Sequence, residues 1–198
     1  IHEQNAIAGT TNKLLAKVAS KRLQAFSGAL PNAETVGNPV RQDLLSMQQR
    51  PVRSEEARPL KLLVVGGSLG AQAINNVVPE LLSSWQKPER LDVWHQTGKH
   101  NYQGVKARYE QLGVEARVAP YIDNMTQAYY WADVVLCRAG AMTVSELALA
   151  GLPAILVPFP FAIDDHQSQN ARQLSDAGAA VLMPQADLTA ENLKRMLS

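Results

Sequence analysis

The sequence contains a single cysteine, Cys137, so it cannot form an internal disulfide bond. Because Cys137 ends a short apolar run, we expect a buried, reduced thiol, which is compatible with a reducing compartment. The formal net charge is only +1 at pH 7, so the overall charge attracts neither nucleic acid nor anionic lipid. The longest uncharged stretch, 147–163, is shorter than the ~20 residues that a membrane span needs, and prolines interrupt it. We expect a globular protein without a signal peptide, a membrane span or a nucleic-acid partner.

Common binding motifs are missing as well. The segment Gly66–Gly70 is neither G-x-G-x-x-G nor followed by Gly-Lys-Ser/Thr, which excludes the dinucleotide fingerprint and the P-loop. It is either a turn that binds phosphate, with help from the Ser68 hydroxyl, or a plain tight turn. The cluster Asp164–Asn170 has no second His or Cys at ligand spacing, which argues against a metal site. It is either a polar loop whose amides bind sugar hydroxyls or a solvated loop with a helix cap.

Strand-like and helix-like segments alternate strictly from Leu60 onward. The predicted strands are Leu62–Val65, Leu91–His95, Ala116–Ala119, Val134–Cys137, Ala154–Val157 and Ala180–Met183. The predicted helices are Ala71–Trp85, Tyr102–Leu112, Met125–Trp131, Thr143–Ala150, Gln167–Ala177 and Ala190–Leu197. The strands are apolar runs without clean two-residue alternation, as expected where helices cover both faces of a sheet. The pattern predicts an α/β fold with a Rossmann-like, doubly wound parallel sheet, whose ligands bind beyond the carboxyl ends of the strands.

The first forty residues follow another pattern. They predict a helix over Lys13–Ser20 and a strand over Lys21–Phe26, before Gly37-Asn38-Pro39 breaks the chain. We therefore expect residues 1–36 to be the end of one domain and residues 37–198 to be a second domain. Both ends of the sequence look cut, because no initiator Met is present and the last predicted helix has no cap.

The segment Arg138–Glu146 joins a predicted strand to a predicted helix and is the most informative part of the sequence about function. Its small residues leave the backbone open, and a helix start offers unpaired N–H groups and a partial positive charge, which together hold a phosphate. Glu146, one turn into the helix, is placed to accept hydrogen bonds from hydroxyls beside that phosphate. The segment predicts a nucleotide or nucleotide-sugar ligand. The alternative is a capping box, with Thr143 as the N-cap and Glu146 reaching back.

The sequence resembles the MurG family of bacterial peptidoglycan N-acetylglucosaminyltransferases in seven motifs that occur in register. They are His2–Gly9, Gly37–Arg41, Gly66–Gly70, His95–Lys99, Tyr121–Met125, Arg138–Glu146 and Asp165–Ala171. The resemblance implies the GT-B architecture, in which two Rossmann-like domains face each other across a cleft. It also implies a hexosyltransferase that moves GlcNAc from UDP-GlcNAc to lipid I, forming lipid II.

The resemblance further implies the residues of a nucleotide site. Ile122 would bind uracil through its backbone, Glu146 would hold the ribose hydroxyls, and Arg41 would close over the nucleotide from the hinge. Ser68 would join the helix start in binding the diphosphate. The residues of that helix start are Ala141, Met142 and Thr143, which act through their amides, followed by Val144 and Ser145.

On the sugar side, the resemblance implies that Gln167 and Asn170 face the GlcNAc hydroxyls and that Asn5 reaches the sugar from the acceptor domain. The family's N-terminal glycine-rich loop, with the histidine proposed as general base, has no counterpart here, and His2 belongs to a different motif. The resemblance therefore implies no catalytic residue in this chain, no metal ligand and no obligatory cofactor. The chain would bind UDP-GlcNAc without turnover, while lipid I and the membrane would be contacted by the missing domain.

By the same resemblance, the chain would be a soluble fragment of a peripheral enzyme at the cytoplasmic face of the bacterial inner membrane. Three other functions are weighed against it. A free-standing UDP-sugar-binding subunit would not need residues 1–30, the tail of another domain. A UDP-GlcNAc epimerase shares the architecture but fits the motifs less well, and a nicotinamide-dependent oxidoreductase is disfavoured by the missing G-x-G-x-x-G.

Overall fold

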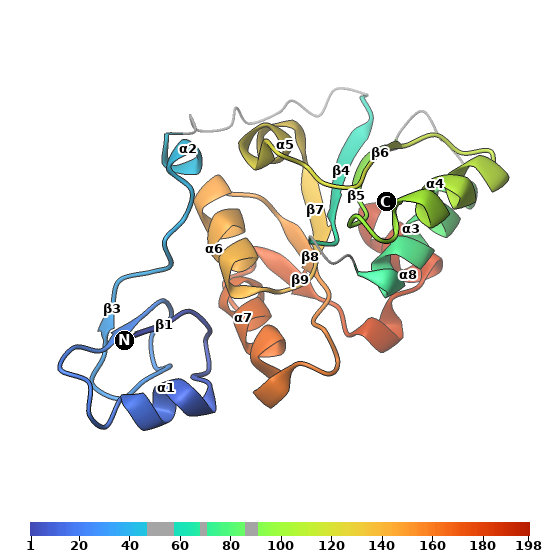
Figure 1. The fold of residues 1–198 in the computed structure, drawn as a ribbon. Helices are drawn as coiled ribbons and strands as arrows, with labels where there is room; N and C mark the ends of the chain where they lie inside the picture. The colour runs from blue at the N-terminus through green and yellow to red at the C-terminus, as the bar shows by residue number, and fades with distance from the viewer. Residues whose placement is uncertain (47–57, 68–70, 86–90) are drawn as a thin grey trace.

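The computed structural model describes residues 1–46, 58–67, 71–85 and 91–198, which form two parallel sheets (Figure 1). The larger sheet has the strand order β6 (Arg117–Ala119), β5 (Leu91–Gln96), β4 (Leu60–Val65), β7 (Val134–Cys137), β8 (Ala154–Leu156) and β9 (Ala180–Leu182). Every neighbouring pair is parallel. The chain starts at β4, runs outward to β6 and returns to pair β7 with the other side of β4. The loops after β4 and β7 therefore flank the switch point of the sheet, where ligands of such folds bind.

The central strand β4 contributes to two separate cores. Leu63 and Val65 join one core, whereas Leu62 and Val64 join the other, and all four are buried. The first core lies under α5 (Met125–Trp131), α6 (Ala141–Ala150) and α7 (His166–Ser175). The second lies under α3 (Gln72–Ser83), α4 (Tyr102–Gln111) and α8 (Ala190–Leu197), on the opposite face in Figure 1. Because helices cover both faces, β7 and β8 are apolar at every position and β4 is apolar except at Lys61, and the predicted doubly wound fold is confirmed.

Each strand and helix predicted from Leu60 onward is present, with its ends within two residues of the prediction. Local chemistry sets these ends. The side chains of Asn124 and Thr189 cap α5 and α8 by accepting from the backbone three residues on. Gly151 ends α6 in the left-handed conformation, at φ 59°. Cys137 is buried and unpaired, as expected, and burial raises the pKa of its thiol to about 12.

The smaller sheet has three short parallel strands, β1 (His2–Glu3), β2 (Leu23–Gln24) and β3 (Glu34–Thr35), beside the helix α1 (Thr10–Leu15). The helix predicted over 13–20 begins earlier and ends earlier, and the strand predicted over 21–26 is only two residues long. At the end of α1, the N–H groups of residues 17 and 18 donate hydrogen bonds to the carbonyls of residues 14 and 15. Such i→i−3 bonds tighten the last turn and end the helix.

A buried carboxylate fixes the loop after β1. Glu3 is 3% exposed and accepts from the backbone N–H of Asn5 at 2.8 Å, from Gly9 N at 3.2 Å and from Asn12 Nδ2 at 2.8 Å. Burial by itself raises the pKa of the Glu3 carboxyl, but these hydrogen bonds outweigh burial, so the pKa lies below its usual value. The loop that carries Asn5 is therefore held in one position.

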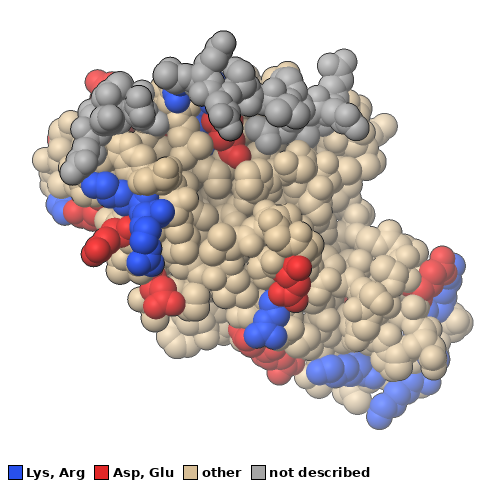
Figure 2. All heavy atoms as spheres, turned by 180° about the vertical axis from the view of Figure 1, so that it is seen from behind, with Lys and Arg blue, Asp and Glu red and all other residues tan. Residues whose placement is uncertain are grey.

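The short helix α2 (Gln42–Leu45) lies between the two sheets along the chain. The N-terminal unit, drawn in blue in Figure 1, lies beside α7, and its contacts with the larger domain are described below. Acidic and basic side chains are interspersed on the face shown in Figure 2, in keeping with the small net charge. Within the described ranges, no helix is long and apolar enough to cross a membrane.

Candidate functional site

The first turn of α6 is open at the switch point of the sheet. Gly140 precedes the helix in an extended conformation, at φ −66° and ψ 144°, and no side chain caps the helix. A Cβ added to Gly140 would meet Thr143 Oγ1 at 3.8 Å, an ordinary contact, so packing within the protein does not require a glycine there. The first i→i−4 bond runs from Val144 N to the Gly140 carbonyl. The amides before it, at Ala141, Met142 and Thr143, therefore face the end of the helix, where an anion is stabilised.

The capping-box interpretation of this segment is wrong. Thr143 lies inside the first turn of α6 instead of ahead of it, because the extended residue is Gly140. Glu146 does not reach back to the backbone: its Oε2 accepts a hydrogen bond from the Tyr129 hydroxyl at 2.9 Å. The carboxylate is thus held by a side chain of another helix, α5.

Arg41 lies in the linker, the segment 36–41 between β3 and α2, and approaches the second carboxylate oxygen of Glu146. Arg41 Nε lies 3.9 Å from Glu146 Oε1, and the Glu146 side chain is 13% exposed. A hydrogen bond with Tyr121 and, more weakly, the charge of Glu146 raise the pKa of the Arg41 guanidinium, although burial opposes them. The structure therefore brings together Arg41 and Glu146, two residues expected to contact the nucleotide.

Two residues expected at the helix start are already engaged within the protein. The side chain of Val144 is buried in the core and its N–H belongs to the helix, so Val144 is not available to a ligand. The Ser145 hydroxyl donates to the Ala141 carbonyl at 3.0 Å and accepts from Asn38 Nδ2 at 3.0 Å. Asn38 also donates to the Gln4 carbonyl at 3.0 Å, so it joins the linker, the N-terminal loop and α6.

The backbone N–H of Ile122, expected to bind uracil, has a partner in this structure. It donates to Gln96 Oε1 at 3.0 Å, and Gln96 is 3% exposed at the end of β5. A base that uses this N–H must therefore take it from the Gln96 amide. Ser68, expected to bind the diphosphate, lies outside the described residues.

The residues expected on the sugar side connect the two units. Asn170 is fully buried: its Oδ1 accepts from Ala6 N at 2.8 Å, and its Nδ2 lies 3.1 Å from Asn5 Oδ1 and 3.2 Å from the Ala139 carbonyl. Asn5 and Asn170 are thus in contact, as the shared role implied, but the Asn170 amide is occupied. The side chain of Gln167 accepts from the backbone N–H of Phe159 at 2.9 Å.

A cavity of about 430 Å³ opens beside these residues. It lies between the N-terminal loop and the start of α7, and its polar lining includes Asn5, Asn12, Asp164 and His166. Asp164 and Asp165 adopt the left-handed conformation, at φ 54° and 51°, which is strained for residues other than glycine. No group of His, Cys, Asp or Glu side chains suited to a metal ion occurs among the described residues.

Arg138, the first residue of the segment Arg138–Glu146, holds the neighbouring loops in place. Its guanidinium donates to the carbonyls of Val157 and Pro158, at 3.2 and 3.1 Å, and to Gln185 Oε1 at 2.6 Å. Burial lowers the pKa of Arg138. The side chain therefore fixes the turn before α6 against the loop after β8.

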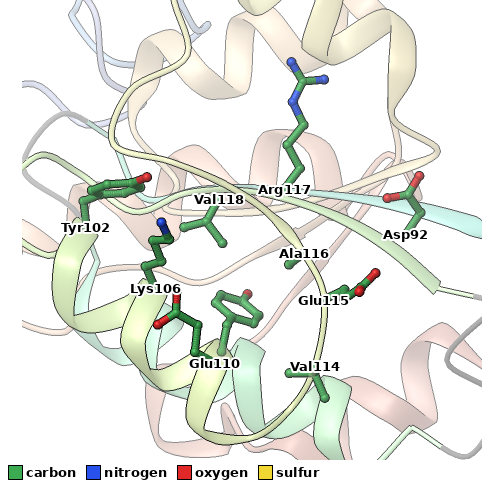
Figure 3. Close-up of a pocket in the computed structure, with 10 residues that line it drawn as sticks. Asp92, Tyr102, Lys106, Glu110, Val114, Glu115, Ala116, Arg117 and Val118 are labelled. Atoms are coloured by element: carbon green, nitrogen blue, oxygen red, sulfur yellow. The ribbon is translucent and has the colours of Figure 1, made fainter.

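A larger pocket, of about 570 Å³, lies away from this site, between α4 and the edge strand β6 (Figure 3). Its charged side chains have both signs, with Lys106 and Glu110 on α4 and with Glu115 and Arg117 at β6. None of the residues expected to bind donor lines it.

Three residues that contact the expected site residues were not assigned a role from the sequence. Asn38 and Gln96 lie in motifs that were recognised, and their amides follow a glycine turn and a strand end, which is a weak signal for a site residue. Tyr129 gives no such signal, because its contact with Glu146 depends on how α5 packs beside α6.

Known proteins resemble this chain over most or all of its length. The model of the glycosyltransferase family 28 C-terminal domain matches residues 61–198. UDP-N-acetylglucosamine–N-acetylmuramyl-(pentapeptide) pyrophosphoryl-undecaprenol N-acetylglucosamine transferases from Shewanella frigidimarina and Chromohalobacter salexigens are 53% and 52% identical, each over 100% of this chain. The chain spans about half the length of these curated relatives, 55% and 56% respectively.

Solved structures of glycosyltransferases are similar to this chain as well. The crystal structure of Acinetobacter baumannii MurG is similar with a TM-score of 0.84 and 40% identity, over 99% of this chain and 56% of that one. A glycosyltransferase of kitacinnamycin, at a TM-score of 0.62, 16% identity and coverage of 92% and 47%, shares the fold. The expected GT-B fold is thereby confirmed. Since the family model covers most of its length, the chain belongs to glycosyltransferase family 28, whose C-terminal domain it carries.

Proposed function

We propose that this chain is the donor-binding part of an inverting glycosyltransferase that transfers GlcNAc from UDP-GlcNAc to lipid I, forming lipid II of peptidoglycan. The observation that carries the proposal is the uncapped start of α6 with the Glu146 carboxylate farther along the same helix, at the switch point of the sheet. A diphosphate beside a ribose needs this pair of features: positive amides for the anion and a carboxylate for the two hydroxyls. The names of the similar enzymes support the choice of donor and acceptor.

In this proposal the amides of Ala141, Met142 and Thr143 bind the diphosphate, with Ser68 beside them. Glu146 binds the ribose, Arg41 closes over the nucleotide, and Ile122 binds uracil through its backbone. The uracil carbonyl would replace the Gln96 amide oxygen at the Ile122 N–H.

The GlcNAc would extend toward the cavity lined by Asn5 and by His166, the residue before Gln167. Asn170 Nδ2 would donate to a sugar hydroxyl by releasing Asn5, since both of its hydrogens already have partners, Asn5 and the buried Ala139 carbonyl. Sugar binding and the contact between the N-terminal loop and α7 would then compete for the same donor group.

The reaction would be a direct displacement. A lipid I hydroxyl attacks the anomeric carbon, the bond from that carbon to the UDP oxygen breaks, and a base takes the hydroxyl proton. The positive end of α6 would stabilise the negative charge that develops on the departing UDP. We place residues 1–36 at the end of the acceptor domain and residues 37–198 in the donor domain. The base, the lipid I site and the contact with the cytoplasmic face of the membrane would belong to a part of the protein outside this chain.

Calorimetry with UDP-GlcNAc and a lipid I transfer assay test the proposal on the isolated chain. We expect saturable binding of UDP-GlcNAc without transfer. A folded chain that binds ADP-ribose or NAD as well as UDP-GlcNAc would contradict the assignment of the donor. Transfer of GlcNAc by the isolated chain would contradict the placement of the base outside it.

A further inference from the structure

Tyr129 connects the hydrophobic core to the candidate ribose site. The residue lies on α5, is 1% exposed, and packs in the core that covers one face of the sheet. Its hydroxyl is the one polar atom of the side chain, and it lies 2.9 Å from Glu146 Oε2. The ring is therefore fixed by packing, while the hydroxyl holds a carboxylate near the surface.

In this hydrogen bond the Tyr129 hydroxyl is always the donor and the Glu146 carboxylate is the acceptor. Burial, and then the negative charge of Glu146, raise the pKa of the Tyr129 hydroxyl above its usual value, so the phenol remains a donor across the physiological range. Glu146 is the acceptor, and a carboxylate offers lone pairs on both of its oxygens. One oxygen is therefore oriented from the core side.

The other oxygen remains available on the linker side. Glu146 Oε1 faces Arg41 Nε at 3.9 Å, beyond normal hydrogen-bond distance, and the Arg41 side chain is 43% exposed. A pair of ribose hydroxyls would thus meet a carboxylate whose rotation is already restricted. Such preorganisation lowers the entropic cost of binding.

We propose that Tyr129 is a positioning residue for the nucleotide: it contacts no substrate, but its hydroxyl holds Glu146 in the orientation that binds the ribose diol. The inference rests on the proposed function, because it assigns the ribose to Glu146. It adds a residue from a different helix, so the ribose site is built by α5 as well as α6.

The test is a double-mutant cycle on the chain, with UDP and 2′-deoxy-UDP as the ligands and calorimetry as the measurement. Tyr129→Phe removes only the hydroxyl and keeps the ring in the core. We expect UDP affinity to fall roughly three- to tenfold, the lower part of the coupling found within one hydrogen-bond network. The preference for UDP over 2′-deoxy-UDP should shrink as well. In the Glu146→Ala background, Tyr129→Phe should change neither quantity.

Tyr109→Phe is the matched control. Tyr109 is also buried, at 3% exposure, but its hydroxyl lies 2.9 Å from His95 Nδ1 on the opposite face of the sheet. We expect it to lower the melting temperature without changing the preference between the two nucleotides. This comparison separates a general loss of stability from a loss of orientation at Glu146.

The outcomes separate the inference from the function on which it rests. Wild-type affinity and ribose preference in a folded Tyr129→Phe variant would overturn the inference, as would an unchanged loss in the Glu146→Ala background. If Tyr129→Phe does not fold, Glu146→Gln serves instead: it still accepts from Tyr129, so it should keep more of the ribose preference than Glu146→Ala. Equal loss in both variants would overturn the inference. A wild-type chain that does not bind UDP would overturn the proposed function first.

Discussion

Asn170 provides a direct test of how the N-terminal unit is held to the larger domain. Asn170→Ala removes three hydrogen bonds, to Ala6, to Asn5 and to the Ala139 carbonyl. Ala139 is fully buried, so its carbonyl would lose a partner that water cannot replace, at a cost of ~1–3 kcal/mol. Asn5 and Ala6 are half-buried and regain water more easily. We expect the free energy of unfolding to fall by about 2–4 kcal/mol in total.

Urea denaturation followed by circular dichroism measures this loss, and limited proteolysis measures the release of residues 1–36. Asn76→Ala is the control, because Asn76 is an exposed asparagine on α3 that receives a hydrogen bond only from Gln72 among the described contacts. Both substitutions raise helix propensity equally, so the difference between them reports the buried contacts. A loss in Asn170→Ala no larger than in Asn76→Ala would refute the reasoning.

Three further predictions concern the site and its support. Glu146→Ala should lower UDP affinity by roughly ten- to a hundredfold, which corresponds to the loss of a charged hydrogen bond. The variant should also lose the preference for UDP over 2′-deoxy-UDP. A lower melting temperature with unchanged UDP affinity would contradict this prediction. Ile122→Pro deletes the N–H now donated to Gln96, so a folded variant should lose its selectivity for UDP over CDP and ADP in competition binding, whereas Ile122→Val keeps it. Burial lowers the pKa of His95 to about 3, so the unfolded chain binds an extra proton below pH ~6.5 and stability falls as the pH drops toward 3. His95→Gln should therefore lose less stability than wild type between pH 7 and 5, and equal losses would contradict the assignment.

The architecture could be predicted because the central strands β4, β7 and β8 are covered on both faces. Apolar runs such as Leu62–Val65 and Val134–Cys137 need no partner information to be recognised as buried strands. The open turn at Gly140 was also predictable, since it depends on residue size and on the alternation of strand and helix. The capping-box alternative failed because Thr143 and Glu146 have the right spacing but the N-cap of the helix is Gly140, three residues before Thr143.

The side-chain partners could not be predicted, because they come from distant parts of the chain. A polar cluster at the start of α7 indicates an exposed loop, yet Asn170 is buried by Asn5 and Ala6, which are far away in the sequence. The contact of Tyr129 with Glu146 depends likewise on the packing of two helices. Periodicity and spacing describe neighbours along the chain, whereas these contacts are decided by the tertiary arrangement.

The strand order also has a consequence for synthesis on the ribosome. β4 is the first strand of the large sheet to emerge, and β5 and β6 can extend it on one side at once. Its other edge stays unpaired until Val134 arrives to meet Leu62, after two intervening β/α units have been made. During that interval the nascent chain carries an apolar central strand with an open edge, the kind of surface that recruits strands from neighbouring chains. Chains that stall before β7 should therefore be the aggregation-prone species, and a chaperone that protects this protein during translation would act in that interval.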